Sequence, residues 1–240
     1  MGFVDLHLHL LPGIDDGARS MEDSLAMARA LTSLGFSAAA PSPHHRAQYA
    51  SSSVELCLAK LEELRGELKA HTLELELFNN AENFFLEEGL FSELGTPRAR
   101  LIGSSKALLV EAPYTGPLPM LPDLVFRMRL KGVTPVIAHP ERCMEFEKKG
   151  RAAEAVRCGA LLQLDLGSLI GRYGKPAQRL AHEFLREGLY AVAATDAHSS
   201  ANLEDWVSLG LGALEKAVGS EGVHQLLERG PRAVLAGAAL

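Results

Sequence analysis

The chain is poor in cysteine and contains no long apolar run. Only three of its 240 residues are cysteines, and they form no Cys-x-x-Cys pair, which suits reduced thiols better than a disulfide framework. No apolar stretch approaches the roughly 20 residues of a membrane span, and the first residues do not resemble a secretory leader. We therefore expect a soluble, cytoplasmic protein without membrane insertion.

Positive charge is also scarce. The chain has 24 Lys and Arg residues against 30 Asp and Glu, which gives a formal net charge of −6, and no basic cluster stands out. Nucleic acids and anionic membranes attract dense Lys and Arg, so neither is an expected partner. With 47% hydrophobic residues the chain can fill one sizeable core, and we expect residues 1–240 to form a single domain. Whether copies associate into a homo-oligomer stays open.

The chain does contain a regular alternation of short apolar runs with longer segments of helical period, which is typical of parallel βα units in an α/β fold. We expect seven parallel strands, at residues 3–10, 36–40, 73–78, 107–111, 134–138, 160–164 and 190–194. We expect helices between them, at residues 21–34, 54–70, 121–131, 150–158, 177–188 and 203–218, with a short one at 223–229.

Candidate metal ligands follow almost every expected strand. His7 and His9 alternate along the first strand and would face the same side, and neutral imidazoles suit transition metals. In a closed parallel barrel, the C-terminal strand ends meet at one mouth, where such folds carry their chemistry. Nine residues fit this arrangement, namely His7, His9, Asp16, His44, Glu82, Glu111, His139, Asp196 and His198. Nine ligands are too many for one ion, so we predict two or three divalent metal ions.

The motifs around these residues resemble those of the polymerase and histidinol phosphatase (PHP) superfamily. They are Asp5-x-His7-x-His9, Leu11 to Gly17, Pro43-His44-His45, Ala81-Glu82, Val110-Glu111, Ala138 to Arg142, Gln163 with the Gly167 to Gly174 loop, and Thr195 to His198. Within the superfamily the chain is most similar to the bacterial capsule-associated, manganese-dependent protein tyrosine phosphatases. The resemblance implies a distorted, TIM-like, seven-stranded (β/α) barrel with a trinuclear metal centre. Mn²⁺ is the expected metal, although such ligands also accept iron or zinc.

The resemblance further implies a phosphomonoesterase that dephosphorylates the tail of a bacterial tyrosine kinase linked to capsule or exopolysaccharide synthesis. Clustered divalent ions suit this reaction because they neutralise the ester and supply a metal-bound hydroxide, which we expect to attack phosphorus directly. Arg142 is expected to hold the phosphate oxygens through its planar guanidinium, with a surface ion pair as the alternative. Further catalytic candidates are His45 and Asp165, for protonating the leaving group, and Arg46, for phosphate contact, with a solvated loop position as the alternative for Arg46.

Two positions depart from the pattern of those phosphatases. Asp165 stands where many relatives have asparagine. Residues 199–205 lack the second arginine that some relatives carry after the last histidine. Both departures concern the binding of substrate, whereas the set of candidate metal ligands is complete.

Two other enzyme classes do not fit the sequence. A cysteine phosphatase needs an arginine six residues after its nucleophile, but Glu63, Lys149 and Leu164 occupy those positions. A urease-type amidohydrolase would carry a lysine at the end of the fourth strand, where Glu111 stands. A small-molecule phosphatase acting on histidinol phosphate would share nearly all the ligands, as would a non-catalytic, metal-stabilised regulator that binds phosphotyrosine. These last two alternatives stay open.

Overall fold

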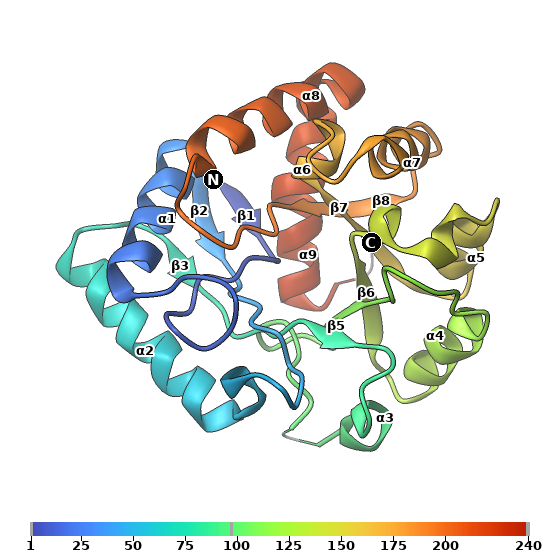
Figure 1. Ribbon diagram of the computed structural model, residues 1–240, viewed down its shortest axis with the longest axis horizontal. Coiled ribbons are helices and arrows are strands. Elements are labelled where there is room, and N and C mark those ends of the chain that lie inside the picture. The colour runs from blue at the N-terminus through green and yellow to red at the C-terminus, as the bar shows by residue number, and fades with distance from the viewer. Residues whose placement is uncertain (1, 97, 239–240) are drawn as a thin grey trace.

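The computed structural model describes residues 2–96 and 98–238, with strands at the centre and helices around them (Figure 1). The described residues form eight strands in two sheets, and every strand pair is parallel. The first sheet has the order β1 (Phe3–Asp5), β2 (Phe36–Ala39) and β3 (Glu76–Leu77). The second has the order β4 (Asn83–Phe84), β5 (Ala107–Glu111), β6 (Thr134–Ala138), β7 (Leu161–Asp165) and β8 (Tyr190–Ala194).

The predicted α/β class is confirmed, whereas the predicted count of seven strands differs from the structure. The additional strand is β4, whose two residues pair with the end of β5. Of the strand expected over residues 73–78, the structure contains only the two residues of β3. Both segments are too short to leave a clear alternation of apolar and polar residues in the sequence.

Most of the helices lie outside the strands, and six of them match expected helices. The helices are α1 (Met21–Ser33), α2 (Val54–Ala70), α3 (Leu90–Glu93), α4 (Leu121–Leu130), α5 (Arg151–Arg157), α6 (Leu166–Leu169), α7 (Lys175–Arg186), α8 (Leu203–His224) and α9 (Gly230–Ala236). In the described residues, α3, α6 and α9 are additional, and the short helix expected at 223–229 falls on the end of α8 and the turn that follows it. Short 3₁₀ turns occupy Ala50–Ser52, Pro140–Arg142 and Met144–Glu147, and one π-helical turn, Gln225–Arg229, joins α8 to α9. Within the described parts of the chain, no helix combines the length and hydropathy needed to cross a bilayer.

Local signals explain several helix boundaries. The hydroxyl of Ser20 accepts a hydrogen bond from the backbone N–H of Asp23 at 3.3 Å, which caps α1. The helix expected to end at Val218 continues in the structure, but Gly219 interrupts it with non-helical angles (φ 71°, ψ 172°). Glycine adopts this conformation readily, so the predicted end corresponds to a kink.

A small apolar cluster fills the space that the strands enclose. It consists of Val4, Leu6, Ala38, Ala40, Ile102, Ala107, Leu109, Val136, Ala138, Val192 and Val234. Val234 comes from α9, which crosses the middle of the molecule in Figure 1. A Cβ atom on Gly230 would lie only 2.4 Å from the carbonyl oxygen of Ala191, so α9 packs closely against the beginning of β8. This end of the barrel is therefore covered, while the C-terminal strand ends stay available for a site.

The first strand is shorter than the sequence predicts, because β1 ends at Asp5 instead of continuing to residue 10. The Asp5 carboxylate accepts hydrogen bonds from the backbone N–H of His7 at 3.0 Å and the hydroxyl of Thr195 at 2.6 Å. Val4 and Leu6 belong to the inner cluster, whereas Leu8 and Leu10 belong to the larger cluster beneath the helices. The alternation of inward and outward side chains therefore shifts by one residue between Leu6 and Leu8, so that His7 and His9 point inward.

Two short backbone contacts join the sheets into a ring. One bridge pairs Leu8 with Ala197, where the N–H of His9 also donates to the Ala197 carbonyl at 2.8 Å. The other bridge pairs His44 with Glu82. Both junctions lie at the C-terminal ends of the strands and include candidate metal ligands, so closure of the barrel and assembly of the site depend on the same segments.

Candidate metal centre

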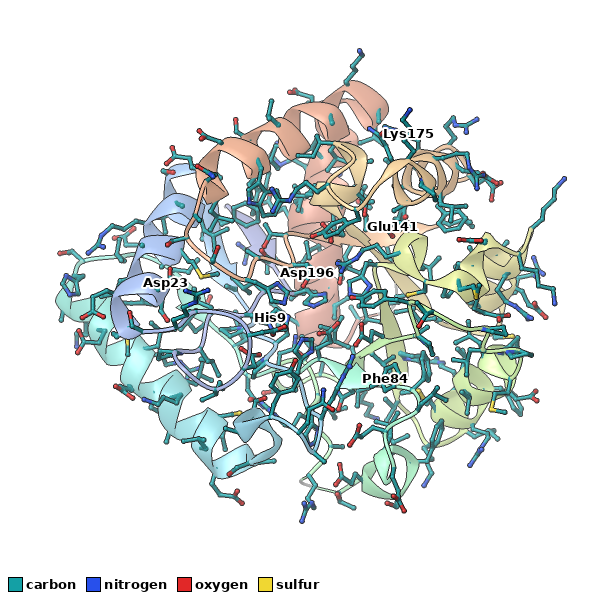
Figure 2. The ribbon with its side chains drawn as sticks, in the orientation of Figure 1. His9, Asp23, Phe84, Glu141, Lys175 and Asp196 are labelled. Carbon is teal, nitrogen blue, oxygen red and sulfur yellow. The ribbon has the colours of Figure 1, made fainter. Side chains whose placement is uncertain are left out.

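The nine candidate ligands lie together at the C-terminal ends of the strands. Each belongs to at least one set of three or four ligand atoms that lie within 4.8 Å of one another. The sets are His9, Asp16, His44 and His198; His7, Glu82 and His139; His7, His9 and Asp196; and His44, Glu82 and Glu111. Figure 2 shows His9 and Asp196 near the middle of the ribbon. We call these nine residues the cluster.

Glu82 connects several parts of the cluster. One carboxylate oxygen lies 3.4 Å from His7 Nε2 and 3.2 Å from His139 Nε2, and the other lies 2.7 Å from His44 Nδ1. The side chain of Glu82 is buried. Because its two oxygens face different histidines, this carboxylate belongs to two of the ligand sets and would contribute to holding a metal in either.

Asp196 provides a second connection. Its Oδ1 atom lies 3.1 Å from His7 Nε2 and 3.5 Å from His9 Nε2. Asp196 has a backbone φ of 52° and His139 has a φ of 31°, both in the left-handed region. Residues other than glycine adopt such angles at a cost of about 1–3 kcal/mol, and they do so most often at functional sites.

The side of the cluster that carries Asp16 is open to solvent. The Asp16 carboxylate lies 3.3 Å from His44 Nε2 and 3.7 Å from His198 Nε2. The exposed fractions of these side chains are 52% for Asp16, 35% for His198 and 12% for His44, whereas His7 and His9 are fully buried. Substrate can therefore reach the cluster from this side.

Two residues outside the cluster orient its histidines. The side-chain oxygen of Gln163 lies 2.8 Å from His7 Nδ1, and an Asp15 carboxylate oxygen lies 2.8 Å from His9 Nδ1. With Nδ1 engaged in this way, each histidine presents Nε2 to the cluster. The sequence motifs contain Gln163 and Asp15, but their role was missed, because only the folded chain shows which histidine each one contacts.

Opposite charges dominate the electrostatics of the cluster. Burial opposes protonation of His7, but the carboxylates of Asp196 and Glu82 outweigh it and raise the pKa of His7 to about 9. Burial also opposes protonation of His44, but the carboxylates of Asp16 and Glu82 outweigh it and raise the pKa of His44 to about 10. The histidines in turn hold the pKa of Glu82 well below its usual range, although burial opposes this. The carboxylates thus create a site that attracts cations.

The buried ligand atoms fit a divalent metal. Among the described residues, several of them lie close to other cluster atoms but make no aligned hydrogen bond, namely His7 Nε2, His9 Nε2, His44 Nδ1 and Glu82 Oε2. A buried polar atom without a partner costs about 1–3 kcal/mol, and proteins rarely keep several in one place. Mixed imidazole and carboxylate ligands suit manganese, iron or zinc, so the cluster matches the predicted metals.

Arg142 lies at the edge of the cluster. Its guanidinium forms ion pairs with Asp165, at 3.0 Å, and with Asp196. The aromatic rings of Tyr173 and Tyr114 lie 3.9 and 4.8 Å from its Cζ atom. The alternative of a surface ion pair with a neighbouring glutamate is wrong, because the side chain points to the site. Asp165 and Asp196 together hold it there.

The other two predicted catalytic residues, Arg46 and His45, have different surroundings in the structure. Arg46 forms an ion pair with Glu111, and its guanidinium lies 4.4 Å from the centre of the Phe84 ring, so it contacts the cluster. His45 Nδ1 lies 3.1 Å from the side-chain oxygen of Asn83. His45 also lines a neighbouring cavity of about 290 Å³ that contains none of the nine candidate ligands.

Comparison with known sequences identifies the family. A family model described as capsular polysaccharide synthesis, CpsB/CapC, matches residues 3–236. The tyrosine-protein phosphatase YwqE of Bacillus subtilis is 30% identical over 226 residues, which cover 94% of this chain and 89% of YwqE. The tyrosine-protein phosphatase CpsB of Streptococcus pneumoniae is 22% identical over 238 residues, which cover 97% of this chain and 98% of CpsB.

Solved structures agree with the sequence matches. One match belongs to the crystal structures of YwqE from Bacillus subtilis and CpsB from Streptococcus pneumoniae, described as unique metal-dependent tyrosine phosphatases. It has a TM-score of 0.89 and 28% identity, and it covers 99% of this chain and 96% of the other. A phosphotriesterase homology protein from Escherichia coli, 12% identical with a TM-score of 0.62 over 98% of each chain, shares the fold alone. The family match over residues 3–236 shows that this chain belongs to the CpsB/CapC family of capsular polysaccharide synthesis.

Proposed function

We propose that this protein is a metal-dependent protein tyrosine phosphatase acting on the tail of a bacterial tyrosine kinase that is linked to capsule or exopolysaccharide synthesis. The observation that carries the proposal is the cluster, in which nine imidazole and carboxylate side chains converge at the open end of the barrel. The relatives YwqE and CpsB are tyrosine-protein phosphatases, which supports phosphotyrosine as the substrate group.

The nine cluster residues are the proposed ligands of two or three divalent ions, with Mn²⁺ as the first choice. Overlapping ligand sets that share His7, His9, His44 and Glu82 provide room for more than one ion. Four carboxylates against three divalent ions leave about +2 by formal charge, which suits a phosphate dianion. When bound, such ions neutralise the ester and make water a nucleophile at neutral pH.

Residues of the chain supply the remaining contacts. Arg142 contacts Asp196 and is placed to bind the phosphate oxygens beside the ions. Arg46, which contacts Glu111, approaches the cluster from another side. We also propose His45, which lines the adjacent cavity, for protonating the leaving group. A tyrosine leaving group has a pKa of about 10, so protonation of it needs little assistance.

We further propose that residues 1–240 act as one catalytic domain and that the protein works in the cytoplasm, where ATP-dependent kinases phosphorylate their targets. The family match extends over residues 3–236, which supports a single functional unit.

Phosphate release by metal-stripped protein, with Mn²⁺ returned, tests the proposed function. The substrates are a phosphotyrosine peptide and histidinol phosphate, and an Asp196→Asn variant serves as the control. We expect Mn²⁺-dependent turnover of the peptide and little turnover of the small ester. A preference for histidinol phosphate would assign the protein to metabolism. Tight peptide binding without turnover of either substrate would identify a phosphotyrosine-binding regulator.

A further inference from the structure

We propose that Arg172 binds a second anionic group of the substrate chain, next to the phosphotyrosine, and thereby makes the protein select phosphorylation sites with negative charge nearby. The proposal rests on the proposed phosphatase function and adds a specificity residue to it. Arg172 lies in the loop between α6 and α7, outside the cluster.

Arg172 lines a cavity that opens from the metal centre. The cavity has a volume of about 260 Å³, and its lining includes Arg142, Arg172, Tyr173, Asp196, His198 and Trp206. Because two of these residues are candidate metal ligands, a phosphate bound at the cluster would lie at one end of the cavity. The rest of the substrate would then extend past Arg172.

The two arginines of this cavity differ in their partners. Arg142 is paired with Asp165 and Asp196, which belong to the metal centre and its edge. Arg172 is exposed, and within residues 2–96 and 98–238 no carboxylate lies at ion-pairing distance from it. Its charge is therefore available to an anion from outside the chain.

Packing holds Arg172 in place. Its guanidinium carbon lies 4.4 Å from the centre of the Trp206 ring, and its backbone N–H donates to the Gly167 carbonyl at 3.1 Å. A Cβ atom on Gly167 would lie 3.0 Å from Cδ of Arg172 and 3.0 Å from Cε2 of Tyr173, so the loop closes tightly over this glycine. A guanidinium that stacks through its face keeps the N–H groups of its edge free for a carboxylate or a phosphate.

Both arginines line the same cavity, so they can contact two groups of one peptide. Arg142 stacks on Tyr173, and Tyr173 directly follows Arg172 in the chain, so the two guanidiniums have separate aromatic supports. In an extended peptide, side chains two residues apart face the same side and lie about 7 Å apart. The second anion is either a carboxylate or another phosphate, since both match the geometry of a guanidinium.

Three phosphotyrosine peptides test the proposal. One has Glu two residues from the phosphotyrosine, one has a second phosphotyrosine there, and one has Ala. We expect wild-type protein to prefer the anionic peptides, and we expect Arg172→Met to reduce the ratio of their kcat/KM to that of the Ala peptide about tenfold, the effect of one charge-assisted hydrogen bond. Arg172→Lys keeps part of the preference. Arg157→Met, a change at an exposed arginine of α5, should leave the ratio as it is.

Trp206 gives a second measurement that needs no turnover. It is the only tryptophan of the chain, so its fluorescence reports binding in this cavity. Phosphonate analogues of the peptides should bind with the same order of preference in wild type, and Arg172→Met should remove that order. An unchanged ratio in Arg172→Met, or a wild type that binds all three analogues equally, overturns the proposal. Discrimination among the analogues without turnover of any peptide would contradict the proposed function and still support the role of Arg172.

Discussion

His7 and Asp196 are joined twice. The backbone N–H of Asp196 donates to the carbonyl oxygen of His7 at 2.8 Å, and Nε2 of His7 lies 3.1 Å from Oδ1 of Asp196. The first contact helps to close the barrel between its first and last strands, and the second lies within the candidate metal centre. A substitution that changes only the side chain can therefore separate catalysis from folding.

Asp196→Asn is the first such substitution. It keeps the backbone contact and the size of the side chain but removes one negative charge from the cluster. We expect turnover of a phosphotyrosine peptide to fall more than about 100-fold, beyond the effect typical of residues that only orient a ligand. Circular dichroism should show an unchanged fold. Turnover close to that of wild type would exclude Asp196 from the metal centre.

Gln163→Leu tests the orientation of a ligand. The substitution removes the oxygen that faces His7 Nδ1 and leaves the cluster otherwise complete. We expect Mn²⁺ affinity, measured by calorimetric titration, to fall about 10- to 100-fold, as for other outer-shell partners of metal-bound histidines. Saturating Mn²⁺ should restore most of the turnover. Gln225→Leu, a change at an exposed position next to α8, is the control and should leave the affinity as it is.

Gly17→Ala tests the close packing beneath His9. A Cβ atom on Gly17 would lie 2.3 Å from Cβ of His9, so His9 or the loop must move. We expect kcat/KM to fall more than about tenfold and the thermal midpoint to fall by several degrees, as expected of overpacking. Gly66→Ala is the matched control, because nothing lies within 4 Å of its new atom and alanine favours a helix by about 1 kcal/mol. An unchanged kcat/KM and thermal midpoint in Gly17→Ala would show that the loop can move without disturbing His9.

Metal removal should lower stability. Binding of an ion to the folded state alone, at a free concentration 100 times its Kd, stabilises by about 2.7 kcal/mol. For a chain of this size that corresponds to about 5–10 °C in thermal midpoint for each ion. We therefore expect differential scanning calorimetry to show a clear drop in the midpoint when a chelator removes Mn²⁺. Equal midpoints with and without the ion would contradict a buried metal centre.

The strands that the sequence predicts well are those whose residues are apolar over a full run. Residues 134–138 and 190–194 coincide with β6 and β8, whereas β4 was missed. Asn83 in β4 donates through its side chain to the carbonyl of Leu109 at 2.9 Å, so a contact with a distant segment supports this short strand. Local periodicity cannot show such a contact.

The candidate ligands were accessible to sequence analysis because histidines and carboxylates stand where strands end. Their supports were not, since Gln163 lies 156 positions from the His7 ring that it contacts. The position of Arg142 also required the structure, because its partner Asp165 ends β7 and its partner Asp196 follows β8, both far away in the sequence.

The most direct test of the metal-dependent phosphatase is a titration of metal-stripped protein with Mn²⁺, in which bound metal and phosphate release from a phosphotyrosine peptide are measured in the same sample. We expect no release without metal and a rise that levels off once two or three ions are bound. Full release by metal-free protein would contradict metal dependence.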